Sequence, residues 1–174
     1  MDVKAAGFRP RKIKIGPDNL RDFFIDHLNR IYSAKVQLVQ RLPEIAGLAT
    51  FTDLRDAILE TTEAVRKQIV RMEEIFEVME IPVPVDYSSA IISLVTEGFT
   101  EVRERSDDPV LRDMSILFYM QNIEGVEMAS FQVLQIAAVK LRNKLVKKLL
   151  KENFDEAKAD RTLLLLVTTK YVVS

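Results

Sequence analysis

Apolar residues recur at steps of three and four along most of the chain, a spacing that is typical of amphipathic helices. The first stripe consists of Leu20, Phe24, Leu28, Ile31, Leu38 and Leu42. It predicts a helix over residues 18–46, and a second stripe from Leu54 to Met79 predicts another over 53–80. Because only a short segment around Gly47 separates them, these two helices should lie antiparallel and side by side.

Two prolines in Ile81–Pro84 end the second helix, since proline favours extended backbone. A shorter apolar pattern then predicts a helix over 86–105. Ser106–Pro109 supplies an acidic cap followed by proline, a start signal for a third long helix over 109–140, and a fourth follows over 144–172. This order predicts an all-α, ferritin-like four-helix bundle, with a long crossover containing a short helix between the second and third long helices.

The third long helix is the least polar. From Ser115 to Val139 its only charged residues are Glu124 and Glu127. A helix that is apolar nearly all round is normally buried, so we expect this one to lie inside the bundle, and its polar residues argue against a membrane span. The fourth helix carries an apolar run, Leu163–Val167. That run predicts packing in the core and against a second copy, and therefore a homodimer that uses apolar helix surface including this helix.

The beginning of the chain is basic and lacks an apolar repeat. Its cations are Lys4, Arg9, Arg11, Lys12 and Lys14. Chain ends without an apolar pattern are usually mobile, so we expect a basic tail over 1–17 and a helical bundle over 18–174. No apolar segment follows the charged start, as a secretory signal would require, and we therefore expect a cytoplasmic protein.

Composition narrows the possible functions. Lys and Arg number 25 against 26 Asp and Glu, for a formal net charge of −1. This near-neutral balance argues against a dedicated nucleic-acid binder, so no nucleic-acid partner is expected. The absence of cysteine excludes thiolate nucleophiles and cysteine-ligated metal centres. A single histidine, His27, argues against a catalytic triad or a multi-histidine metal site, and no catalytic residue is predicted.

Several acids nevertheless fall where the bundle should be closed. Glu124 and Glu127 are one turn apart in the third long helix, Glu156 and Asp160 are one turn apart in the fourth, and Glu63 lies in the second. A buried carboxylate needs a partner or a metal ion, since leaving it unpaired costs several kcal/mol. Ferritin-like bundles use inward-facing acids, together with histidines, to hold two iron ions.

Cations occupy the same region of the predicted bundle. Lys35 falls on the apolar stripe of the first helix, and Arg66 lies one turn after Glu63. Two interpretations stay open: the acids bind metal, or Lys35 and Arg66 neutralise them in an internal ion-pair network. The residues favour the network, because the lone His27 lies two turns from Lys35, about 12 Å along the helix axis.

Over roughly residues 18–165 the chain resembles the YciF-like ferritin-like family, bacterial proteins associated with stress responses. The matching segments are Asp22–Lys35, Glu63–Arg66, Ile123–Phe131 and Asp155–Ala159. The resemblance implies a ferritin-like fold, a di-iron site and dimer formation. Against the family pattern, however, Lys35 replaces a glutamate, Arg66 replaces a histidine, and the third long helix keeps both acids but loses its histidine.

These replacements put fixed cations where a metal cation would bind, and like charges repel strongly in a partly dry core. We therefore expect a non-enzymatic, stress-associated protein without a cofactor. Its degenerate di-iron positions, expected to form a buried ion-pair network, are Lys35, Glu63, Arg66, Glu124, Glu127 and Glu156. The alternative is a di-iron carboxylate oxidase, peroxidase or iron-handling protein with an altered metal site.

Overall fold

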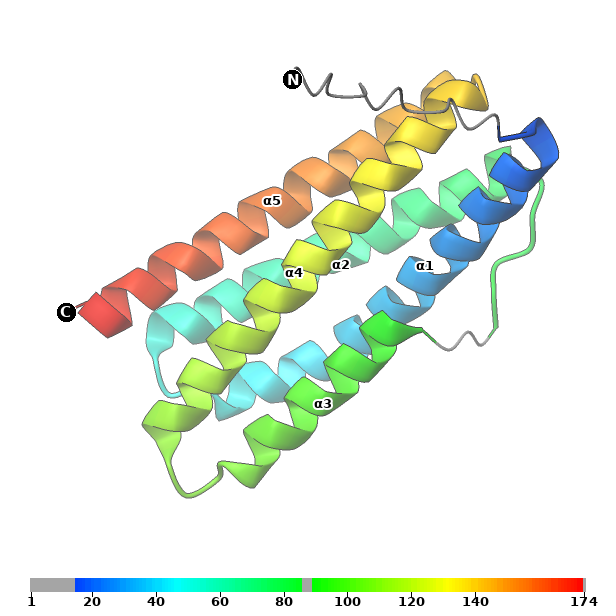
Figure 1. Ribbon diagram of the computed structural model, residues 1–174. Coiled ribbons are helices and arrows are strands. Elements are labelled where there is room, and N and C mark those ends of the chain that lie inside the picture. The colour runs from blue at the N-terminus through cyan, green and yellow to red at the C-terminus, as the bar shows by residue number, and fades with distance from the viewer. Residues whose placement is uncertain (1–14, 86–88, 174) are drawn as a thin grey trace, which may run out of the picture.

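The computed structural model describes residues 15–85 and 89–173, so the tail predicted over 1–17 lies mostly outside the described residues. The helices are α1 (Pro17–Leu48), α2 (Thr52–Val78), α3 (Ala90–Glu104), α4 (Pro109–Lys140) and α5 (Lys144–Val173). The four long helices run side by side along the bundle, and the short α3 follows one half of it (Figure 1). The predicted helices are confirmed, with ends within a few residues of those expected.

The helices pair as two hairpins. α1 packs against α2, and α4 packs against α5; α2 also packs on α5, and α1 on α4. α3, which lies in the long crossover, packs on both α1 and α4. This connectivity is that of the predicted ferritin-like bundle. Short turns join α1 to α2, α3 to α4, and α4 to α5.

Two aspartates fix these turns. Asp108 caps α4, because its side chain accepts a hydrogen bond from the Leu111 amide at 3.0 Å. The residue before α2 offers no side-chain cap. Instead, the fully buried Asp113 of α4 accepts hydrogen bonds on Oδ2 from the amides of Thr50 and Phe51, at 2.8 and 2.7 Å. Asp113 therefore ties the α1–α2 turn to α4 and supplies acceptors that the turn itself lacks.

The short α3 approaches α4 closely at Gly98. A Cβ atom added to this residue would lie 2.7 Å from Cγ of Tyr119, closer than real side chains approach one another. The hydroxyl of Tyr119 also donates a hydrogen bond to Oε2 of Glu101, at 2.6 Å. This bond lowers the pKa of Glu101 and raises that of Tyr119 to about 12, since it stabilises the carboxylate and holds the phenolic proton. Because Gly98 has no side chain, the ring of Tyr119 can approach the backbone of α3 closely.

The prediction that α4 is buried nearly all round is wrong. Its exposed apolar residues are Phe118, Val126, Val133, Ile136 and Val139, with exposed fractions between 39% and 66%. They share the outward face with Ala129, and no charged side chain lies on this face between Phe118 and Val139. The apolar run of α5 divides in the same way, since Leu164 is buried whereas Leu165 and Leu166 are exposed. Among the described helices, none has the length and hydropathy that crossing a bilayer requires.

The core consists of two apolar clusters along the bundle. One contains Leu42 and Ile58, and the other contains Phe24 and Phe131. The largest buried hydrophobic residues fall within these clusters. Between them lie buried polar side chains, with Lys35 in the middle of α1. The predicted site therefore interrupts an otherwise apolar core near half the length of the bundle.

Candidate functional site

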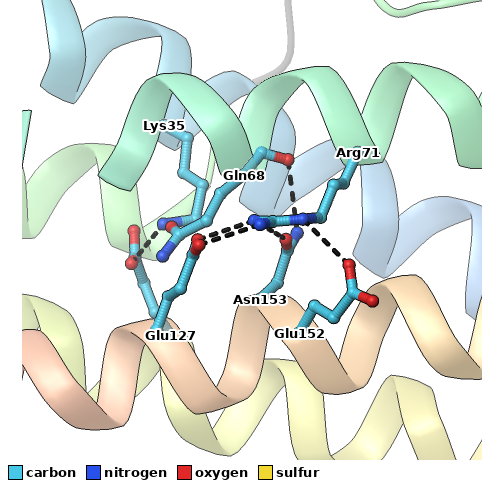
Figure 2. A network of polar contacts seen from close by, with 7 residues as sticks. Lys35, Gln68, Arg71, Glu127, Glu152 and Asn153 are labelled. Carbon is cyan, nitrogen blue, oxygen red and sulfur yellow. Dashed lines mark hydrogen bonds and ion pairs between the residues drawn. The ribbon is translucent and has the colours of Figure 1, made fainter. Parts of the chain in front are cut away.

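Buried polar side chains from all four long helices meet between the two clusters. We call them the charged layer: Lys35 of α1, Gln68 of α2, Glu124 and Glu127 of α4, and Asp160 of α5. Lys35 Nζ lies 2.5 Å from Glu127 Oε2, and both side chains are fully buried. Figure 2 shows the two side chains pointing toward each other from α1 and α4. A charge-assisted hydrogen bond thus joins two helices across the core.

Glu124 lies one turn before Glu127 on the same inner face of α4. It is 1% exposed, and neither carboxylate oxygen has a hydrogen-bond partner among the described residues. Burial raises the pKa of Glu124 well above its usual range; the charge of Glu127 adds to the rise, and Lys35 opposes it. Burial therefore favours the protonated form of this carboxyl group, because ionisation would place an unpaired charge in the core.

Asp160 brings a third acid into the charged layer from α5. It is only 5% exposed. Burial raises the pKa of Asp160 from 3.8 to about 7; Lys35 opposes the rise, whereas Glu127 contributes to it. The layer thus combines the Lys35–Glu127 ion pair with two carboxyl groups, those of Glu124 and Asp160, whose pKa values burial raises. The lysine pairs with one carboxylate, and burial favours the protonated forms of the other two acids.

The contribution of α2 is neutral. Gln68 is fully buried, and its side-chain amide has no hydrogen-bond partner in the described parts of the chain. The buried Asn153 of α5 donates a hydrogen bond from Nδ2 to the backbone carbonyl oxygen of Gln68 at 3.2 Å, as Figure 2 shows. This bond joins α2 to α5 beside the charged layer. Burying an isolated charge at this depth costs more free energy than burying a neutral amide, so the glutamine of α2 destabilises the core less than an acid would.

A second ion cluster borders the layer on the α2–α5 side. Arg71 of α2 donates to both carboxylate oxygens of Glu156, at 2.6 and 2.8 Å, and its Nε lies 3.1 Å from Glu152. The Arg71 side chain is 21% exposed. The hydrogen bonds from Arg71 to Glu156 raise the pKa of the guanidinium, although burial opposes this. This bidentate clamp is the strong geometry for an arginine and a carboxylate.

Glu156, predicted as a member of the buried network, thus lies in this bordering cluster, and two more of the predicted site residues lie on the surface. Glu63 and Arg66 pair with each other on the surface of α2, where more than half of each side chain is exposed. The prediction that Arg66 neutralises core acids is therefore wrong, and Arg71 is the residue that binds Glu156. The buried stripe of α2 includes Val65 and Gln68. Glu63 and Arg66 are off this stripe, so their spacing from each other could not bring them into the core.

The charged layer does not fit a pair of metal ions. Lys35 donates a hydrogen bond to Oε2 of Glu127, an oxygen that a metal ion would need as a ligand. α2 presents an amide rather than an acid or imidazole. No three His, Asp or Glu side chains within residues 15–85 and 89–173 come together in a way that could hold a metal ion. Metal binding by carboxylate oxygens is favoured when no competing cation lies beside them. The donor set of this layer therefore suits protons and one ammonium group.

These features define a class: a ferritin-like helical bundle with a buried lysine–glutamate pair in its acidic core. The family model for a domain of unknown function, DUF892, matches residues 19–172, and the chain belongs to this family. It is 30% identical to Protein YciF of Escherichia coli K12 over 141 residues, which cover 80% of this chain and 84% of YciF.

Solved structures agree with this assignment. The structure of the E. coli stress protein YciF matches with a TM-score of 0.83 at 28% identity, covering 89% of this chain and 98% of that one. YcfI from Rhodopseudomonas palustris matches with a TM-score of 0.77 at 27% identity, covering 90% and 97% of the two chains. The predicted resemblance to the YciF-like family is confirmed by these matches.

Proposed function

We propose that this protein is a non-enzymatic, stress-associated member of its family, in which a lysine–glutamate pair replaces a di-iron site. The observation that carries the proposal is the 2.5 Å contact between Lys35 Nζ and Glu127 Oε2 in a fully buried environment. The association with stress rests on the similarity to YciF, which is described as a stress protein. The protein would then retain the bundle for its surfaces rather than for redox chemistry.

Accessibility supports a role without catalysis. Lys35, Glu124 and Glu127 are all at most 1% exposed, so a substrate would have to open the bundle to reach them. A groove of about 890 Å³ lies between α1, α3 and α4, and its lining contains none of the charged-layer residues. A catalytic site normally combines a pocket with its reactive groups. The groove is lined by other charged side chains, among them Asp26, His27 and Arg30, whereas the buried acids of the charged layer lie outside it.

Metal loading tests this proposal. Protein purified without chelators is incubated anaerobically with ferrous iron, desalted and measured by elemental analysis. We expect no retained iron in the parent chain, and stoichiometric iron in Lys35→Glu, because the substitution removes the competing ammonium and adds a carboxylate. Lys67→Glu, which adds the same charge at an exposed position of α2, is the matched control and should retain none.

Iron bound by the parent chain would contradict the replacement and favour the di-iron oxidase, peroxidase or iron-handling alternative. Peroxide and oxygen turnover would then become the assays to perform. Iron retained equally by Lys35→Glu and Lys67→Glu would show adsorption to surface acids. A cytoplasmic location is part of the proposal and is tested by fractionating cells that express the protein.

We also propose that the protein forms a homodimer through the outward face of α4, with the exposed leucines of α5 beside it. This face is uncharged from Phe118 to Val139, and Ala129 near its centre allows two helices to approach closely. A largely apolar face without charge, on which Asn122 and Gln132 are the exposed polar residues, is typical of an interaction surface. Ile136→Glu should convert a dimer to a monomer in light scattering. Val70→Glu, at a similarly exposed apolar residue of α2, is the control. A parent chain that is already monomeric contradicts this proposal.

A further inference from the structure

The corner where α4 ends and α5 begins is strongly basic. From Met128 to Lys151 the chain contains no Asp or Glu. Its cations, all exposed, are Lys140, Arg142, Lys144, Lys147, Lys148 and Lys151. We call these six residues the basic ridge. The chain as a whole has a net charge of −1, so the positive charge of the ridge is balanced by acids elsewhere on the molecule.

The ridge has a regular geometry on α5. Counted from Lys144, the lysines at 147, 148 and 151 lie three, four and seven residues further along α5, so the four share one helix face. The opposite face, which includes Val146, is buried in the core. The lysines therefore point away from the bundle. From the first to the last of them the ridge is about 10 Å long, at 1.5 Å per residue.

Most of these cations have no ion-pair partner among the described residues. Lys148 lies 3.7 Å from Glu152, and Lys151 pairs with Asp155 one turn further along α5. Lys144 and Lys147 form no ion pair with any residue that the structure describes, and the same holds for Lys140 and Arg142. The ridge is thus not part of a network that stabilises the described fold.

Four cations of the ridge, the three lysines in the first two turns of α5 and Arg142, occupy positions that local structure does not favour. Lysines in the first two turns of α5 lie at the positive end of the helix dipole, where acids are favourable and cations are not. Like charges at these spacings also repel one another. Finally, Arg142 has φ = 57°, in the left-handed region that glycine or asparagine adopts at least cost. Cations therefore occupy positions where local structure favours other residues.

The side chains around the lysines indicate which partner fits. A lipid surface requires large apolar groups on the same face as the cations, to enter the acyl boundary. The lysine face itself has none: Leu145 is 39% exposed but lies on the side of the buried Leu149, and Val139 belongs to the apolar face of α4. Phe154, one turn after Lys151, is partly buried against the core cluster that contains Phe24 and Phe131, so it is not a free ring on which single-stranded bases would stack. A narrow row of point charges matches a phosphate backbone.

We propose that the basic ridge binds the phosphate backbone of double-stranded DNA without reading its sequence. The near-neutral total charge argues against such a partner, but the structure concentrates six cations on one corner instead of spreading them. Binding through the backbone needs only local charge, and lysines supply it without base-specific geometry. The inference does not depend on the proposed loss of the metal site, because the ridge and the charged layer share no residue.

Fluorescence anisotropy with a short duplex of random sequence tests the proposal on the full chain. We expect a Kd of about 10⁻⁴ to 10⁻⁶ M near physiological salt, rising steeply between 50 and 200 mM. In the variant Lys144→Gln/Lys147→Gln/Lys148→Gln, the affinity should fall at least about tenfold, and the slope of log K against log salt should decrease by about 3, one for each lysine replaced. Thermal melting should be unchanged or higher, since the removed charges repel each other.

The control variant is Arg66→Gln/Lys67→Gln/Lys158→Gln, which removes the same number of positive charges from exposed sites outside the ridge. It should bind duplex DNA as the parent does. Three results overturn the proposal. The first is no binding by the parent at 50 mM salt, and the second is an equal loss of affinity in the two triple variants. The third is binding to vesicles of anionic phospholipid without binding to the duplex.

Discussion

Asp160 should make the protein less stable as the pH rises. Its folded-state pKa of about 7 exceeds the ordinary value of 3.8, so the folded protein holds this proton more tightly than the unfolded chain does. The stabilisation is fully present below the ordinary value and is lost as the pH rises toward 7. A pKa difference of about three corresponds to a total of about 4 kcal/mol. Of this, about 2.5 kcal/mol should be lost between pH 5 and pH 8.

Asp160→Asn removes the titrating group and keeps its shape. Urea unfolding followed by circular dichroism at pH 5, 6, 7 and 8 gives the free energy of unfolding for both proteins. The variant should be more stable than the parent at pH 8, and the difference should shrink toward pH 5. Asp155→Asn, on the exposed side of the same helix, controls for a general effect of charge. Parallel pH profiles for the parent and Asp160→Asn would refute the reasoning, because the buried acid would then not titrate in this range.

Three other substitutions test the packing described above, each by chemical or thermal unfolding. Arg71→Ala should lower the free energy of unfolding by about 1–3 kcal/mol, since it removes charge-assisted hydrogen bonds, whereas Arg66→Ala should change it by no more than about 0.5 kcal/mol. Equal effects would contradict a stabilising contact between Arg71 and Glu156. Asp113→Ala should lower the stability by about 2 kcal/mol, because two amides then have no acceptor, and an unchanged melting temperature would show that the α1–α2 turn does not need them. Gly98→Ala should cost about 1–3 kcal/mol by clashing with the tyrosine ring of α4, whereas Gly47→Ala, with open space around it, should be neutral or stabilising.

The fold could be predicted from sequence because its signals are local and repeated. Apolar residues at helical spacing, the prolines of Ile81–Pro84 and the capping Asp108 each fix an element through neighbouring residues. The order of long and short helices then leaves few arrangements. The exposed face of α4 was not predictable in this way. Its composition indicates that it should be covered but does not say whether the chain or a second copy covers it.

The charged layer could be predicted only in part. Lys35 interrupts the clearest apolar stripe of the chain, so its burial follows from periodicity. Glu63 and Arg66 look like a functional pair because they are close in sequence, but on α2 they lie off the buried stripe. Arg71, which does bind Glu156, carries no local signal: its partners are in α5, 81 to 85 positions further along the chain. Such a contact depends on how two helices are aligned, which spacing within one helix does not determine.

The charged layer also has a consequence for how the helices are aligned. Apolar side chains along a bundle can exchange partners if one helix slides by a turn, about 5.4 Å, with little change in buried area. Such a slide of α1 toward the Phe131 end of α4 would move Lys35 away from Glu127 and place it among apolar side chains. A slide in the other direction would bring Lys35 to Glu124, one turn before Glu127. Removing a buried charge from its partner costs about 3–5 kcal/mol. The pair therefore disfavours a slide of α1 toward the Phe131 end of α4, an alignment that the apolar residues alone would tolerate.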